Sequence, residues 1–395
     1  MNDFAFYSPT RFVFGRGAEN KVGALVKGLG GTKALLHFGG GSARRSGLLG
    51  RVEKSLADAG VGCVSLGGVR PNPRSGLVRE GIALCRREKV DFVLAVGGGS
   101  VIDSAKAIAF GTLYEGDFAD YYFGKDVKNQ PQVPAALPIG TVLTIAAAGS
   151  EGSANSIINL EPGNLKRGAT GDALRPKFSV LNPELTFTLP PFQTACGLTD
   201  IFAHVVERYF TPTKDVTVTD ELCEAVMRTV IAESAKVRTN PQDYEARANI
   251  MWAGTIAHNN VCGVGRAQDW SSHGIEHELS ALYDCAHGAG LAVVMPAWME
   301  YVMETDLARF ARFARRVWEV TDADPKSAAQ EGIRRYRAWL KSIGMPQTFK
   351  ELGAKEEDIP KLVATLGLKG NTLGAFRPLA DEDVANILRR AASVV

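Results

Sequence analysis

Five carboxylate and imidazole side chains stand at spacings that could hold a metal ion. Asp200 and His204 are four residues apart in the largely apolar stretch CGLTDIFAHVVERYF, which predicts a helix. Side chains four apart lie on the same side of a helix, so this carboxylate and this imidazole can bind one ion together. The alternative is a local role, in which Asp200 caps or pairs nearby and His204 is an ordinary core histidine.

Three further histidines fall in the stretch AQDWSSHGIEHELSALYDCAHGAGL. His273 and His277 are four residues apart on a predicted helix, and His287 follows where that helix ends. Either of the first two could face the same ion as Asp200 and His204, with His287 arriving from the following loop. The pattern is not HExxH, which excludes a metalloprotease. A carboxylate with imidazoles and no thiolate suits Fe(II) or Zn(II).

Two glycine clusters, HFGGGSARR and AVGGGSVID, end apolar runs that read as buried strands. Each precedes a predicted helix, so the glycines would let the backbone approach a ligand while the helix N-terminus offers N–H groups to an anion. A tight strand-to-helix turn without a ligand is the alternative. The second cluster is the better candidate for a pyrophosphate site, because Ser100 can donate to a phosphate and Asp103 lies one turn inside the helix.

The first glycine turn bears on the choice of nucleotide. An acidic residue near the adenine ribose selects NAD, whereas small and basic residues accommodate the 2′-phosphate of NADP. Residues 39–45 read GGGSARR and contain no carboxylate. Gly40, Ser42 and Arg44 therefore favour NADP, although Arg44 could also belong to an ordinary solvated helix start.

The elements that must position these residues divide the chain into two predicted domains. From KALLHFGGGS to VIDSAKAIAF, strand-like runs alternate with amphipathic segments, which is typical of a Rossmann-like α/β domain with a parallel sheet. The stretch SANSIINLE before EPGN predicts a hairpin arm. After the double proline near residue 191 only long helical patterns occur. We expect an α/β dinucleotide-binding domain over 1–190, an all-α metal-binding domain over 191–395, and an active site in the cleft between them.

Composition limits the partners of the chain. Its 395 residues contain 45 lysines and arginines against 43 aspartates and glutamates, so no strong field predicts nucleic acid or a membrane as partner. Six scattered cysteines form no CxxC pair, and neither a signal peptide nor a spanning apolar run stands out. These features predict a cytoplasmic protein that acts on small molecules.

The stretches QTACGLTDIFAHVVERYF and QDWSSHGIEHELSALYDCAHGAGLAVVMPAWM, with GGGSVIDSAK upstream, resemble the iron-containing alcohol dehydrogenase family. Within it the chain is most similar to the NADPH-dependent butanol dehydrogenases and broad aldehyde reductases, over essentially its whole length. The resemblance implies a homodimer. It implies as metal ligands Asp200, His204, His273 and His287, with His277 beside the site. It implies cofactor contacts at Gly40, Ser42, Asn72, Gly98, Gly99, Ser100, Asp103, Thr144 and Lys166.

The chain departs from the family pattern at two positions of this region. It has Ala148 and Ser153 where threonine and asparagine are usual around the nicotinamide, which removes potential hydrogen bonds to the cofactor.

The expected reaction is reversible hydride transfer between NADPH, or NADH, and short to medium aliphatic or aromatic aldehydes, with a divalent ion polarising the carbonyl. His277 either relays the proton or orients a neighbouring group. Three alternatives have other activities. They are a polyol or glycerol dehydrogenase, a metal-dependent lyase resembling dehydroquinate synthase, and a catalytically silent binding protein. The lyase would want several basic residues near the metal, where this chain is apolar.

Overall fold

The computed structural model describes residues 1–124 and 130–393 and divides them into two compact units. We call Tyr7–Leu189 the N-terminal unit. Pro190–Val395 form the helical unit together with Met1–Phe6. The first residues are tied to the helical unit by the backbone N–H of Asn2, which donates to the Gly265 carbonyl at 2.8 Å.

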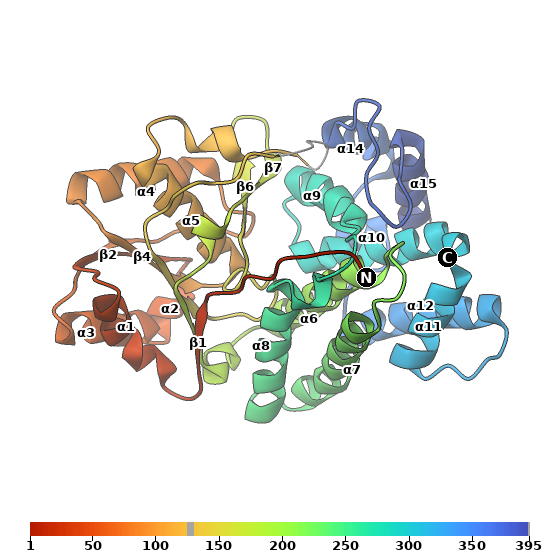
Figure 1. The fold of residues 1–395 in the computed structure, drawn as a ribbon, viewed down its shortest axis with the longest axis horizontal. Coiled ribbons are helices and arrows are strands. Elements are labelled where there is room, and N and C mark those ends of the chain that lie inside the picture. Colours follow the sequence, from red (N-terminus) through yellow and green to blue (C-terminus); the bar gives the residue numbers. More distant parts are fainter. Residues whose placement is uncertain (125–129, 394–395) are drawn as a thin grey trace. The chain divides into compact units, whose positions relative to one another are not determined.

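The N-terminal unit is built on a six-stranded, fully parallel sheet (Figure 1). The strands are β1 (Arg11–Phe14), β2 (Lys33–Phe38), β3 (Gly62–Leu66), β4 (Phe92–Gly97), β5 (Ile139–Leu143) and β8 (Phe178–Leu181), in the order β1-β8-β5-β4-β2-β3. The central strands β4 and β5 are buried along their whole length, as expected where helices cover both faces of a parallel sheet.

The connections supply the helices of this unit and one hairpin. The helices are α1 (Val22–Gly28), α2 (Ser42–Arg45), α3 (Leu48–Asp58), α4 (Ser75–Glu88) and α5 (Gly99–Leu113). The predicted hairpin forms from β6 (Asn155–Leu160) and β7 (Leu165–Thr170), which pair antiparallel around the EPGN turn. Helix α5 packs against β4 and β6, so it joins the sheet to the hairpin.

The strand order places a topological switch between β2 and β4. The chain runs from β2 outward to β3 and then returns to the other side of β2 with β4. In open α/β sheets, ligands bind beyond the carboxyl ends of the strands at such a switch. Both glycine turns follow these two strands, so the fold brings them to the same edge of the sheet.

Below the first glycine turn, His37 of β2 has a structural role. Its Nδ1 lies 2.9 Å from the Leu66 carbonyl of β3, and its Nε2 lies 2.9 Å from Oγ of Ser104 on α5. Burial lowers the pKa of His37 to about 4, so the ring is neutral at pH 7. The ring therefore links β2 to β3 and to α5.

The helical unit contains the remaining α-helices of the described residues. They are α6 (Pro191–Tyr209), α7 (Thr217–Thr239), α8 (Tyr244–His258), α9 (Ser271–Tyr283), α10 (His287–Val302), α11 (Leu307–Trp318), α12 (Pro325–Ser342), α13 (Phe349–Leu352), α14 (Ile359–Leu366) and α15 (Asp381–Ala392). Of the described residues after 190, only Leu373 and Leu379 form a β-bridge. No helix in the described part of the chain combines the length and the apolar character that a membrane span needs. The predicted fold class, an α/β half followed by an all-α half, is confirmed.

Helix α6 is the centre of the helical unit. Pro191 at its first turn lacks an N–H that would need a partner, and from Ala195 to Tyr209 every residue is buried. The helix packs against α7, α8 and α10. A helix surrounded in this way holds its side chains rigidly, which suits Asp200 and His204 for positioning an ion.

Candidate metal centre and nucleotide site

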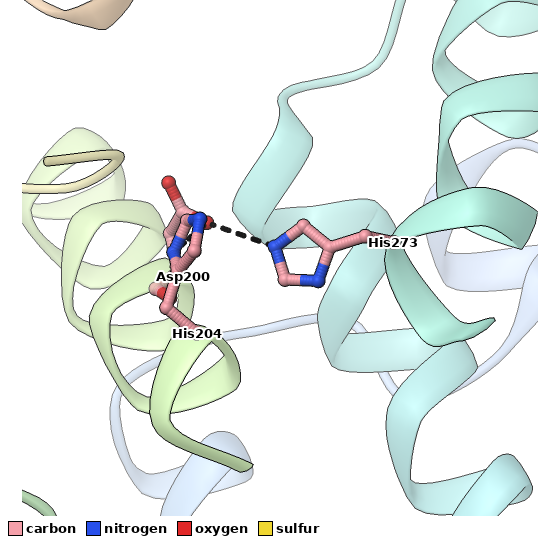
Figure 2. A group of neighbouring side chains, drawn as sticks. All are labelled: Asp200, His204 and His273. Atoms are coloured by element: carbon pink, nitrogen blue, oxygen red, sulfur yellow. Dashed lines mark hydrogen bonds and ion pairs between the residues drawn. The ribbon is translucent and has the colours of Figure 1, made fainter. Parts of the chain in front are cut away.

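Three helices bring the predicted ligands together. Asp200 and His204 lie one turn apart on α6, His273 lies in the first turn of α9, and His287 is the first residue of α10. Figure 2 shows the His273 ring directed toward the two side chains of α6. Asp200, His204 and His273 are almost fully buried, and 24% of the His287 side chain is exposed.

The carboxylate of Asp200 is the point where the imidazoles converge. Its Oδ1 lies 3.1 Å from His204 Nδ1, 3.6 Å from His287 Nε2 and 3.8 Å from His273 Nε2. This oxygen is buried, yet it makes no hydrogen bond of acceptable geometry among the described residues. A buried carboxylate oxygen left in this state normally has an ion or water at hand. One carboxylate and three imidazoles therefore fit a divalent cation such as Fe(II) or Zn(II).

The protonation states of this group suit metal binding. Burial raises the pKa of Asp200, but the neighbouring His204 and His287 outweigh it, and the net pKa lies well below its usual value. Burial lowers the pKa of His204 to about 4 against the opposing effect of Asp200. The His204 Nδ1–H donates to the Asp200 carbonyl at 2.8 Å, which leaves Nε2 as the free lone pair. At neutral pH the pair is thus a carboxylate and a neutral imidazole, the forms that bind metals.

Two buried glutamates contact the histidines, and the sequence analysis did not single them out. Oε1 of Glu207 accepts hydrogen bonds from the backbone N–H of His273 at 2.8 Å and from its Nδ1 at 2.9 Å. Oε2 of Glu276 bonds to Nδ1 of His287. Each glutamate contacts a histidine of another helix, 66 residues away for Glu207 and 11 for Glu276, so no helical spacing in the sequence marks either contact.

The two other histidines of this unit also lie close to the cluster. The His277 ring centroid is 5.6 Å from that of His287, and a ligand atom of each lies within 4.8 Å of one from Glu276. His258, which is distant in sequence from the other histidines of this unit, lies beside His204. Its ring centroid is 4.3 Å from that of His204, and its Nδ1 accepts a hydrogen bond from Arg208 at 3.1 Å. This contact joins residues of two different helices, α8 and α6, that are far apart in the sequence, so the spacing of the histidines could not predict it.

The predicted nucleotide contacts gather at the carboxyl edge of the sheet. They follow β2 (Gly40, Ser42, Arg44), β3 (Asn72), β4 (Gly98, Gly99, Ser100) and β5 (Thr144). The cap residue of α5, Gly98, has no side chain to cap the helix, and its carbonyl accepts from the Val101 and Ile102 N–H groups at 3.0 and 3.1 Å, so the N–H groups of Gly99 and Ser100 are the candidates for binding an anion. A Cβ at Gly98 would lie 2.1 Å from Cγ2 of Ile145, so this glycine is required by the turn itself. The edge fits a pyrophosphate.

The first glycine turn is open to solvent. Gly40, Ser42 and Arg44 are all exposed, and a Cβ at Gly40 would meet nothing within 4 Å. The Arg44 guanidinium lies 5.6 Å from the centroid of the Phe38 ring. The turn therefore has room and a positive charge for a phosphate, and residues 39–45 contain no carboxylate that would repel one.

Asp103 and Lys166, the two remaining predicted contacts, are buried at the junction of α5 with the hairpin. Oδ2 of Asp103 accepts a hydrogen bond from the Ile157 backbone N–H at 3.0 Å. Burial raises the pKa of Asp103, and the charges of Lys106 and Lys166 oppose that rise. Lys166 lies on β7, so the hairpin brings its ammonium near the same carboxylate.

Lys106 of α5, not predicted as a functional residue, contacts Ser153, one of the two positions that depart from the family pattern. Its Nζ is fully buried and donates to the Ser153 carbonyl at 2.9 Å, to Ser153 Oγ at 3.3 Å and to the Asn155 carbonyl at 2.7 Å. The serine at position 153 thus bonds to α5 and holds the loop that leads into β6.

A switch-point sheet edge and a buried group of one carboxylate and three imidazoles define a metal-dependent, nucleotide-using enzyme, and comparisons with known proteins agree. Residues 9–183 match the family model described as iron-containing alcohol dehydrogenase, and residues 194–392 match that of the Fe-containing alcohol dehydrogenase family, C-terminal.

Two curated relatives and one crystal structure cover nearly the whole chain. NADH-dependent butanol dehydrogenase A of Clostridium acetobutylicum is 39% identical over 99% of this chain and 100% of its own length. NADPH-dependent aldehyde reductase YqhD of Escherichia coli is 35% identical over 94% of this chain and 95% of its own. The crystal structure of NADH-dependent butanol dehydrogenase A from Thermotoga maritima is 42% identical, with a TM-score of 0.95 over 100% of this chain and 99% of that one.

The chain belongs to the iron-containing alcohol dehydrogenase family. It is an oxidoreductase that uses a nicotinamide cofactor and a metal ion, so the family and the reaction class predicted from the sequence are confirmed.

Proposed function

We propose that the protein reduces short to medium aldehydes with NADPH, reversibly, at an ion held by Asp200, His204, His273 and His287. The observation that carries this proposal is that Nε2 of His273 and Nε2 of His287 both lie within 4 Å of the buried Asp200 Oδ1, with a ligand atom of His204 in the same group. A divalent ion bound there supplies a Lewis acid that polarises the carbonyl, and the nicotinamide supplies the hydride. Butanal is the probe substrate, because relatives of the chain are named butanol dehydrogenases.

The chain's own groups prepare this reaction in two ways. The uncapped start of α5 and the glycine turns hold the pyrophosphate, which fixes the dinucleotide by its phosphates. The helices α6, α9 and α10 bury Asp200, His204 and His273 almost completely, so charges at these side chains act in a medium of low polarity.

The preference for NADPH rests on the first glycine turn, where Arg44 is exposed and no carboxylate occurs. One relative is named as NADH-dependent and another as NADPH-dependent, so the preference is tested as the ratio of kcat/KM with the two nucleotides. Butanal reduction should give a kcat/KM with NADPH at least about tenfold above that with NADH, since one charge-assisted contact contributes about 1.5–3 kcal/mol. Equal values would contradict the preference, and no turnover with any aldehyde would favour the silent-binder alternative.

We further propose His277 as the group that passes the final proton to the alkoxide, because its ring lies 5.6 Å from that of His287. The variant His277→Ala should lose turnover by about 100-fold, and the pH profile of kcat should lose one ionisation. Metal content measured on the same preparations separates this role from ligation. An unchanged pH profile and turnover would exclude the relay.

The chain is also proposed to form a homodimer, in which β1 offers a pairing edge. This strand is one of the two edge strands of the sheet, and Phe14 at its end is 44% exposed. Light scattering on the assay samples should give twice the mass of the 42.3 kDa chain, and the mass of one chain would exclude the dimer.

A further inference from the structure

We propose that Glu207 and Glu276 are positioning residues of the metal centre. Each holds one imidazole in the tautomer that presents Nε2 to the ion, and each adds a negative charge behind that imidazole. The inference rests on the metal site proposed above. It adds two residues that act on the ion through its ligands.

The contact of Glu207 determines the tautomer of His273. Oε1 of Glu207 accepts from the His273 backbone N–H at 2.8 Å, and a backbone amide can only donate. The same oxygen lies 2.9 Å from Nδ1 of that ring, so Nδ1 carries the proton. Nε2 then keeps its lone pair, and it lies 3.8 Å from Asp200 Oδ1. Glu207 is fully buried, so water does not compete for this bond.

Glu276 holds His287 in the same way from another helix. Its Oε2 contacts Nδ1 of His287, whose Nε2 lies 3.6 Å from Asp200 Oδ1. Gly290 fixes the position of this glutamate. A Cβ at residue 290 would lie 2.7 Å from Cγ and 2.8 Å from Oε1 of Glu276, so the carboxylate packs directly against a glycine of α10. Any larger residue there would displace the side chain.

Charge gives these contacts a function beyond packing. Glu207, Glu276 and Asp200 place three carboxylates around three imidazoles in a buried region. Buried carboxylates need compensating positive charge. A divalent ion bound by the imidazoles would supply this positive charge. A carboxylate that is hydrogen-bonded to a metal-binding histidine also makes the ring a stronger electron donor to the metal.

The test is the affinity of metal-free protein for Co(II), followed by its visible absorption. The variants E207Q and E276Q keep the shape of the side chain and remove the charge. We expect the dissociation constant to rise about 10- to 100-fold in each, with an altered absorption band. The matched control is E224Q. Glu224 is equally buried on α7, but its Oε1 accepts from the Tyr209 hydroxyl at 2.9 Å and Arg312 Nε at 2.6 Å. E224Q should bind Co(II) as tightly as the wild type.

A second variant covers the case in which E276Q fails to fold. Gly290→Ala displaces the Glu276 carboxylate without removing its charge, and it should also weaken Co(II) binding. Wild-type affinity in folded E207Q and E276Q would overturn the inference and leave the metal site intact. A wild-type protein that binds no Co(II) would overturn the proposed site, and the inference with it.

Discussion

Asparagine in place of Asp200 is expected to weaken metal binding by about 100- to 1000-fold and to lower butanal-dependent NADPH oxidation to a similar extent. Asparagine keeps the shape of the side chain but removes the negative charge that Nε2 of His273 and Nε2 of His287 face. Removing one partner of a buried ionic group costs about 3–5 kcal/mol, and each 1.4 kcal/mol is a factor of ten in affinity. Metal content after dialysis against a metal buffer measures the effect.

The control for this variant is Asp220→Asn. Asp220 is also buried in the helical unit, where its carboxylate pairs with Arg266 at 2.8 Å and Arg309 at 2.6 Å. The control should lower the stability of the protein and leave the metal content of the folded fraction unchanged. If both variants lost metal equally, the loss in Asp200→Asn would reflect general destabilisation, and the ligand role would be contradicted.

Methionine in place of Lys106 is expected to destabilise the N-terminal unit by about 3–5 kcal/mol, as for other broken buried charge pairs. The substitution removes three hydrogen bonds to Ser153 and Asn155 and the nearest positive charge to the buried Asp103. Burial lowers the pKa of Lys106 to about 8, so its ammonium is still mostly charged at pH 7. Urea unfolding at pH 7, followed by circular dichroism, measures the change.

The same variant should raise the KM for NADPH, because the segment that Lys106 holds leads into the hairpin that carries Lys166. The matched control is Lys54→Met. The Lys54 side chain is 74% exposed and pairs with Asp58 one turn along its helix, so its loss should change stability by less than about 0.5 kcal/mol. Equal unfolding midpoints for the two variants would contradict the role given to Lys106.

The sequence predicted the parts of the fold that depend on local periodicity. Strand and helix segments follow from alternating apolar runs, and Asp200 with His204 follows from a spacing of four on one helix. The order of the strands does not follow from such patterns, because the pairing of β2 with β4 depends on how separate crossover units assemble. That the two glycine turns lie at a switch point of the sheet could therefore be read only from the structure.

The rest of the site depends on contacts between elements distant in sequence. Either His273 or His277 could have faced Asp200, since both lie on the same side of α9. The rotation of that helix brings His273 Nε2 within 3.8 Å of Asp200 and leaves His277 beside His287. Glu207 and Lys106 were missed for the same reason, because their partners lie 66 and 47 to 49 residues away along the chain.

The most direct test of the central claim is an anaerobic titration of metal-free enzyme with Fe(II), in which bound metal and butanal-dependent NADPH oxidation are measured on the same samples. A parallel titration with Zn(II) shows which ion supports turnover. The structure predicts that activity rises in proportion to bound metal up to one ion per chain, and that His273→Ala gains neither metal nor activity. Full activity of the metal-free enzyme, or wild-type metal content in His273→Ala, would contradict the assignment of the ion to Asp200 and the three histidines.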